Sequence, residues 1–103
     1  MPVEIKSINY HLPELVVNNN DLMLENPGWG MALAGNRAGV HERHIAGEHE
    51  TALDMAHTAC QELFEANPGL RSTVDGLIFC TQSPDHIMPP SSCFLHGLLE
   101  LPD

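Results

Sequence analysis

The spacing of apolar residues along the chain predicts three strands. Apolar positions alternate over residues 3–10 and change phase midway, which indicates a strand with a bulge. Residues 40–45 alternate as well and predict a short strand after the turn at Gly39. Residues 74–81 are almost continuously apolar, as expected of a central strand buried on both faces of a parallel sheet.

Helical signals lie between these segments. The stretch Asn18-Asn19-Asn20-Asp21-Leu22 supplies the N-cap of a short helix, which the Asn26-Pro27-Gly28 turn ends. Thr51 and Asp54 form a capping signature for the clearest helix of the chain, where apolar residues recur at helical spacing as far as Asn67. Residues 29–38 are expected to be irregular or weakly helical.

A third helix is predicted near the C-terminus, capped by Ser91 or Ser92. Together with the strands, this helix predicts an α/β fold with a right-handed crossover. The expected architecture is an incomplete mixed sheet with packed helices. Residues 1–103 form one continuous unit without an internal domain boundary. Its predicted core strands are too few to cover the apolar helices, and the chain ends at Asp103 without a closing strand. We therefore expect a fragment of a larger domain.

Composition narrows the class of protein. Hydrophobic residues make up 43% of the 103 residues, too many for a disordered acidic tail, yet no apolar run approaches the length of a membrane span. The formal net charge of −10 argues against nucleic-acid binding. The N-terminus has no secretory signal, so a cytoplasmic protein is expected. Three cysteines without paired spacing indicate reduced thiols.

Few residues offer catalytic chemistry. Cys93 and His96 lie three apart at the start of the last helix, where they resemble a nucleophile and base, although a buried thiol beside a partly exposed histidine is the simpler interpretation. Cys60 and Cys80 are expected in the core. His41 and His44 fall on opposite faces of the strand over residues 40–45, so no metal site is expected.

The placement of the four cations is more informative. Arg37 and Arg43 flank the turn at Gly39, and in so acidic a chain a guanidinium is suited to an anionic ligand group. The alternative is that both arginines pair with acids such as Glu42. The acidic pairs at Glu48 and Glu50 and on the central helix are expected to be solvated surface.

The order of several motifs resembles that in the β-ketoacyl-[acyl-carrier-protein] synthase III family. Members of this family are condensing enzymes of the thiolase superfamily. The matching stretches are Leu12-Pro13-Glu14, Asn19-Asn20-Asp21-Leu22, the run from Arg37 to Ala46, Cys80-Thr81-Gln82-Ser83-Pro84-Asp85, Met88-Pro89 and Leu101-Pro102. The resemblance spans essentially the whole chain. It implies the N-terminal part of the first thiolase-like half.

The resemblance implies a protein of fatty acid biosynthesis and lipid metabolism. Such an enzyme transfers an acyl group from acyl-coenzyme A to a cysteine and condenses it with malonyl-acyl carrier protein. That cysteine and its histidine and asparagine partners are expected beyond Asp103, which leaves the chain alone inactive. The implied partners are acyl-coenzyme A as substrate, the carrier protein and a second subunit of a homodimer, with no resident cofactor.

Four residues are carried over from the resemblance. Arg37 corresponds to a coenzyme A contact and Trp29 to an adenine-stacking residue, while Thr81 and Met88 correspond to positions in the acyl pocket or dimer contact. The family usually has threonine where this chain has Ala38, and its tryptophan lies closer to the arginine. These departures keep two alternatives open: a thiolase-fold starter-unit acyltransferase of polyketide or other secondary metabolism, and a small non-catalytic acidic binding module.

Overall fold

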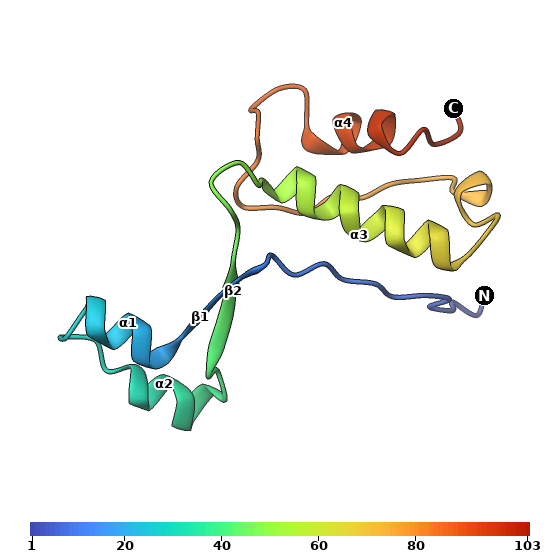
Figure 1. The fold of residues 1–103 in the computed structure, drawn as a ribbon. Coiled ribbons are helices and arrows are strands. Elements are labelled where there is room, and N and C mark those ends of the chain that lie inside the picture. The colour runs from blue at the N-terminus through green and yellow to red at the C-terminus, as the bar shows by residue number, and fades with distance from the viewer. The chain divides into compact units, whose positions relative to one another are not determined.

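The computed structural model describes residues 1–103, which form two compact units. Unit 1 consists of Met1–His11 and Glu50–Asp103, and unit 2 consists of Leu12–His49. The secondary-structure elements labelled in Figure 1 are β1 (Leu15–Asn18), α1 (Asn19–Glu25), α2 (Met31–Ala38), β2 (Glu42–Ile45), α3 (Ala52–Ala66), the 3-10 turn η1 (Arg71–Thr73) and α4 (Ser91–Leu98).

Unit 2 is a two-stranded sheet that carries a pair of helices between its strands. β1 and β2 are antiparallel, with Leu15 opposite Ile45 and Asn18 opposite Glu42. The predicted strand over residues 40–45 is thus confirmed. β1 was not predicted, and α2 is a regular helix where residues 29–38 were expected to be irregular or weakly helical.

Polar side chains fix the junction between the strands and helices of unit 2. The Asn18 side chain accepts hydrogen bonds from two backbone N–H groups of α1, which confirms the predicted N-cap. Asn19 donates from its amide to the carbonyl of Val40 and from its backbone N–H to the carbonyl of His41. Gly39 ends α2 with φ of 69°, a left-handed conformation that glycine adopts without steric cost.

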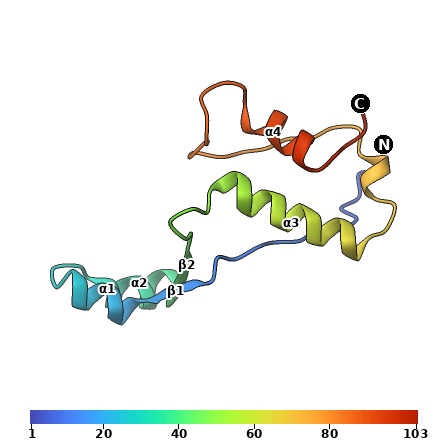
Figure 2. The same ribbon diagram turned by 45° about the horizontal axis from the view of Figure 1, so that its top comes forward.

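Unit 1 is built around α3. Thr51 and Asp54 form a complete capping box at its N-terminus, as the sequence predicts. α4 lies beside α3 in the two views of Figures 1 and 2. The N-terminal segment is attached to α3 by side chains, because the Asn9 amide donates to the Ala59 carbonyl and the Asn67 amide donates to the Ser7 hydroxyl.

The hydrophobic core lies in unit 1, between α3 and α4. Its buried members are Leu53, Leu95, Leu99 and Leu101. Partly buried apolar residues pack around them: Ala56, Cys60, Phe64, Val74, Leu77 and Phe79. Because only four hydrophobic side chains are buried, each contributes a large share of the stabilisation of this unit.

Two predicted strands are absent. Residues 3–10 and 74–81 form no backbone ladder, and both run as irregular chain. Residues 77–81 nevertheless keep a period of two, because Leu77 and Phe79 face the core while Ile78 is 96% exposed. No neighbouring strand pairs with this segment. It is also not buried on both faces, as the sequence suggested.

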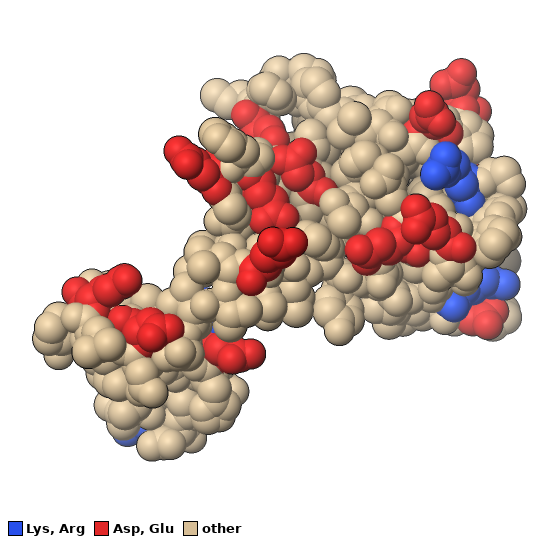
Figure 3. All heavy atoms as spheres, viewed as in Figure 1, with Lys and Arg blue, Asp and Glu red and all other residues tan.

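The surface is strongly acidic. Figure 3 shows Asp and Glu side chains on both units and only a few Lys and Arg, in agreement with 14 acidic and 4 basic residues. None of the helices has the length and apolar character needed to span a membrane. No group of three or more His, Cys, Asp or Glu side chains is arranged to hold a metal ion.

Candidate functional site

A hollow of about 180 Å³ lies at the start of α4, and we call it the α4 hollow. Its lining residues come from the segment after Leu77, the loop that follows and the first turn of α4: Phe79, Thr81, Pro84, His86, Ile87, Pro90, Ser91 and Ser92. The His86 ring packs against the Phe94 ring with centroids 4.9 Å apart, which fixes one wall of the loop. Apolar walls and several hydroxyl groups therefore meet in one small space.

The two residues predicted for an acyl pocket differ in their placement here. Thr81 lines the α4 hollow, and its hydroxyl accepts a hydrogen bond from the backbone N–H of Ser83 at 3.1 Å. Met88 follows the lining residue Ile87 but is 79% exposed and does not line the hollow. The structure therefore places Thr81, but not Met88, at this hollow.

The N-terminus of α4 is not capped by a serine. Pro90 is the N-cap residue, with extended backbone, and it has no side-chain group to accept from the helix. The prediction that Ser91 or Ser92 caps the helix is wrong, because the fixed φ of proline suits the position before the first helical residue and puts both serines inside the first turn. The Ser91 hydroxyl is buried and has no hydrogen-bond partner.

Cys93 and His96 border a second hollow, of about 340 Å³, together with Leu77 and Ser92. His96 Nε2 lies 3.2 Å from the carbonyl oxygen of Pro102, which can only accept, so this nitrogen is the donor. Cys93 is exposed, and no hydrogen bond joins it to His96. The two residues share a surface without forming an assembled nucleophile and base.

Arg37 and Arg43 have different surroundings in unit 2. Arg43 donates to the carbonyl of Val17 and to the side-chain oxygen of Asn19, so it holds β1 and β2 together. It does not pair with Glu42, which was the simpler expectation. Arg37 lies exposed in the last turn of α2 and makes neither a hydrogen bond nor an ion pair. Of these two arginines, only Arg37 is free to bind an anionic ligand.

Trp29 is half-exposed in the segment before α2. Its backbone N–H donates to the carbonyl of Asn26, and its own carbonyl accepts from Met31, so the backbone is fixed while the ring remains 55% exposed. No ring contact or cation contact joins Trp29 to Arg37. The two residues therefore make no direct contact, and their shared role at a nucleotide stays a prediction.

A further hollow between α1 and α2 was missed in the sequence analysis. It has a volume of about 340 Å³ and is lined by Asn18, Asn19, Asn20, Met23, Ala32, Gly35, Asn36 and His41. A side chain at Gly35 would meet Asn19 and His41 at 3.4 Å, so glycine allows both groups to approach α2 closely. The run Asn18 to Asn20 is the signal in the sequence, but it is also a helix cap.

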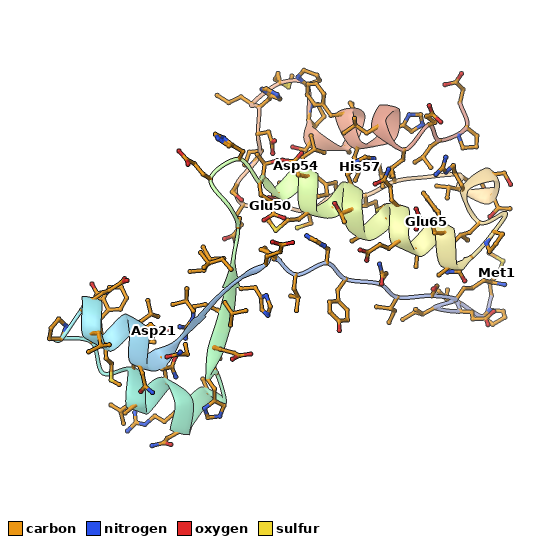
Figure 4. The ribbon with its side chains drawn as sticks, viewed as in Figure 1. Met1, Asp21, Glu50, Asp54, His57 and Glu65 are labelled. Atoms are coloured by element: carbon orange, nitrogen blue, oxygen red, sulfur yellow. The ribbon has the colours of Figure 1, made fainter.

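Two groups on α3 have shifted pKa values. Hydrogen bonds from the backbone and side chain of Thr51 lower the pKa of Asp54, and His57 on the next turn adds a small lowering effect. Figure 4 labels both residues near the N-terminal half of α3. Burial raises the pKa of the Cys60 thiol, which favours its uncharged form.

Known proteins are similar to this chain over most of its length. No family profile matches it. Curated β-ketoacyl-[acyl-carrier-protein] synthase III from Xylella fastidiosa is 36% identical over 92 residues, and that from Thioalkalivibrio sulfidiphilus is 33% identical over 92 residues. These alignments cover 86% and 87% of this chain. Over most of its length the chain is similar to members of the β-ketoacyl-[acyl-carrier-protein] synthase III family.

Solved structures agree with this family. A crystal structure of 3-oxoacyl-(acyl-carrier-protein) synthase III matches 95% of the chain with a TM-score of 0.84 and 39% identity. The synthase III from Thermus thermophilus matches 90% with a TM-score of 0.81 and 28% identity. The predicted α/β, thiolase-like class is therefore confirmed. The chain spans about 28% of the length of the synthase III relatives that it matches.

Proposed function

We propose that this chain forms part of a 3-oxoacyl-[acyl-carrier-protein] synthase III. Such an enzyme condenses an acyl-coenzyme A thioester with malonyl-acyl carrier protein and releases carbon dioxide. The observation that carries the proposal is the TM-score of 0.84 at 39% identity over 95% of the chain. The proposal includes the acyl carrier protein and a second copy of the protein as partners, and fatty acid biosynthesis as the process.

Within that protein, unit 2 is proposed to contact the acyl donor. Arg37 supports this role because it is the unpaired cation of an acidic chain and offers bidentate hydrogen bonds to a phosphate. The exposed ring of Trp29 offers a stacking surface for a base. Thr81 and Met88 are proposed to contact the acyl group or the partner subunit.

The test is an assay of a longer protein that contains this chain. It is incubated with radiolabelled acetyl-coenzyme A and malonyl-acyl carrier protein, and we expect decarboxylation and a 3-oxoacyl carrier-protein product. The 103-residue chain is expected to catalyse neither step, because Cys93 has no hydrogen-bonded base. A stable thioester on the chain that disappears in Cys93→Ser would contradict this expectation.

Arg37→Ala in the longer protein should weaken the use of coenzyme A thioesters by about 1.5 to 3 kcal/mol, the contribution of a charge-assisted hydrogen bond. Carrier-protein thioesters should be affected less. The kcat/KM values with the two donors give the measurement. Lys6→Ala is the control, because Lys6 is an exposed cation already paired with Glu4. An equal loss with both donors, or no loss, would assign Arg37 to structure.

Met88→Phe should lower kcat/KM selectively for long acyl donors. Methionine is unbranched and changes rotamer easily, whereas phenylalanine is rigid, and one methylene in an apolar pocket is worth about 1 to 3 kcal/mol. Competition between acetyl and octanoyl donors gives the chain-length ratio directly. A uniform fall across chain lengths, or dissociation of a dimer with an unchanged ratio, would show that Met88 acts only in packing.

A second candidate is a starter-unit acyltransferase of polyketide or other secondary metabolism on the same fold. Ala38 favours it, because it removes a hydroxyl between Arg37 and Gly39 where relatives usually have one. Such an enzyme would accept acyl groups from another carrier. The two candidates differ in the assay above, since the starter-unit enzyme would transfer the acyl group without consuming malonyl-acyl carrier protein.

A further inference from the structure

One side-chain pair joins the two ends of unit 2. The chain leaves unit 1 after His11 and returns to it at Glu50, so unit 2 is a long excursion between these two residues. His11 Nε2 lies 3.2 Å from Glu50 Oε1, and the imidazole donates because a carboxylate oxygen can only accept. Both side chains are mostly sheltered, with 22% and 28% of their surfaces exposed. We call this pair the base clasp.

A second tie, inside unit 2, joins the same two stretches of chain. His44 Nδ1 donates to the carbonyl of Pro13, and the ladder of β1 and β2 follows with Leu15 opposite Ile45. An Nδ1–H group is present in the imidazolium and in one neutral tautomer, so this bond persists when the ring loses its charge. The base clasp differs because its acceptor is a carboxylate, which attracts His11 as an ion only while the ring is protonated.

The charges around the base clasp leave its pH dependence to His11. The other titratable or charged groups on the segments that meet there are Tyr10, Glu14, Arg43, His44, Glu48, His49 and Asp54. All of these except Arg43 and His44 are exposed or bonded within their own turn, and Arg43 donates to Val17 and Asn19 in the sheet. Histidine changes charge between about pH 5 and pH 8, whereas a glutamate carboxylate stays charged over that range. The ionic attraction in the clasp is therefore present in mild acid and is lost as the pH rises.

We propose that the base clasp is a pH-dependent latch on unit 2. When His11 is protonated, an ion pair holds the two ends of the excursion together and limits fraying at the adjacent end of the β1–β2 ladder. When His11 is neutral, one ordinary hydrogen bond remains and the ends separate more often. The latch is a property of this chain itself and does not rest on the proposed function. It adds a change in the dynamics of the unit that carries Arg37 and Trp29.

Amide hydrogen exchange over a pH series tests the latch. The ¹⁵N-labelled chain is measured from about pH 5 to pH 8, and each rate is divided by the intrinsic exchange rate at that pH to give a protection factor. We expect protection in β1 and β2 to fall about two- to fivefold as the pH rises, which is the effect of losing one partly exposed ion pair. Amides in the second half of α3 should keep their protection. The fall should follow the titration of the His11 ring resonances, and constant protection, or a fall that does not follow them, would overturn the proposal.

Matched variants assign the pH dependence to the pair. His11→Gln and Glu50→Gln each keep a side chain that can hydrogen-bond but remove one charge, so protection in β1 and β2 should no longer change with pH. His49→Gln is the control, because His49 is an exposed histidine next to Glu50, and the fall should persist. A fall that persists in His11→Gln, or disappears in His49→Gln, contradicts the latch. The comparison with the His11 resonances in the unaltered chain stands even if a variant fails to fold. Failure of the proposed function is distinct, since it appears as absent condensation in the longer protein.

Discussion

At the scale of single residues, the capping box of α3 makes the clearest contribution to stability. The Thr51 hydroxyl accepts from the Asp54 N–H at 3.2 Å, and the Asp54 carboxylate accepts from the Thr51 N–H at 2.9 Å. Thr51→Ala should lower the free energy of unfolding by about 1 kcal/mol, measured by urea denaturation. Thr58→Ala in the same helix is the control and should be nearly neutral. Equal effects of the two substitutions would contradict the capping role.

The same box gives a pH dependence with a definite sign. Because Thr51 lowers the pKa of Asp54 below its usual 3.8, the folded state favours the charged carboxylate. The resulting stabilisation is present above that usual value and is lost as the pH falls through the lowered pKa. As the pH is lowered from about 5 to 2, the urea concentration at the unfolding midpoint should therefore decrease more steeply for the unaltered chain than for Thr51→Ala. Parallel curves would show that the Thr51 hydroxyl contributes nothing to this pH dependence, since the backbone N–H of residue 51 still donates to Asp54 in Thr51→Ala.

Local sequence could predict the caps but not the partners of the site residues. Asn18, Thr51 and Asp54 act on backbone within three residues, so their roles are visible in the sequence. Arg43 is held by Val17 and Asn19, more than 20 residues earlier, whereas Arg37 has no partner. The difference between the two arginines depends on the pairing of β1 with β2. No spacing rule contains that information.

At the scale of elements, α4 depends on one face of leucines. Leu95 is 2% exposed in the core between α3 and α4, whereas Leu98 is 50% exposed on the same helix. Leu95→Ala should cost about 2 to 5 kcal/mol of unfolding free energy, because it leaves a cavity. Leu98→Ala should cost less than about 1 kcal/mol. Thermal unfolding of both variants measures the two losses of unfolding free energy. Similar losses would show that Leu95 does not lie in the core.

Helices were predicted more reliably than strands for a physical reason. A helix satisfies its hydrogen bonds within its own segment, so the caps and apolar spacing of α3 specify it completely. A strand needs a neighbour. β2 was recognised and is paired with β1, whereas residues 74–81 carry an equally strong apolar pattern and have no neighbouring strand. β1 was overlooked because its apolar residues, Leu15 to Val17, are consecutive and show no alternation.

At the scale of the whole molecule, the two units depend on different interactions. Unit 1 has a leucine core, whereas unit 2 has no fully buried hydrophobic residue and is joined by the hydrogen bonds of β1, β2 and Asn19. The similarity to synthase III covers both units. The similarity to synthase III was therefore predictable from motif order, while the α4 hollow was not, because its residues come from separate segments brought together by packing.

The exposed extended segments should make the chain self-associate. Residues 74–81 present unpaired backbone groups and an Ile78 side chain that is 96% exposed, which together form a template for strand pairing between chains. Ile78→Lys should raise the monomer fraction, because a lysine on an open edge disfavours pairing. Ile87→Lys is the control, since Ile87 is 95% exposed but lies in the bent loop before α4. Sedimentation at several concentrations measures the monomer fraction. A monomeric unaltered chain with one cooperative thermal transition would contradict the expectation, as would equal effects of the two lysines.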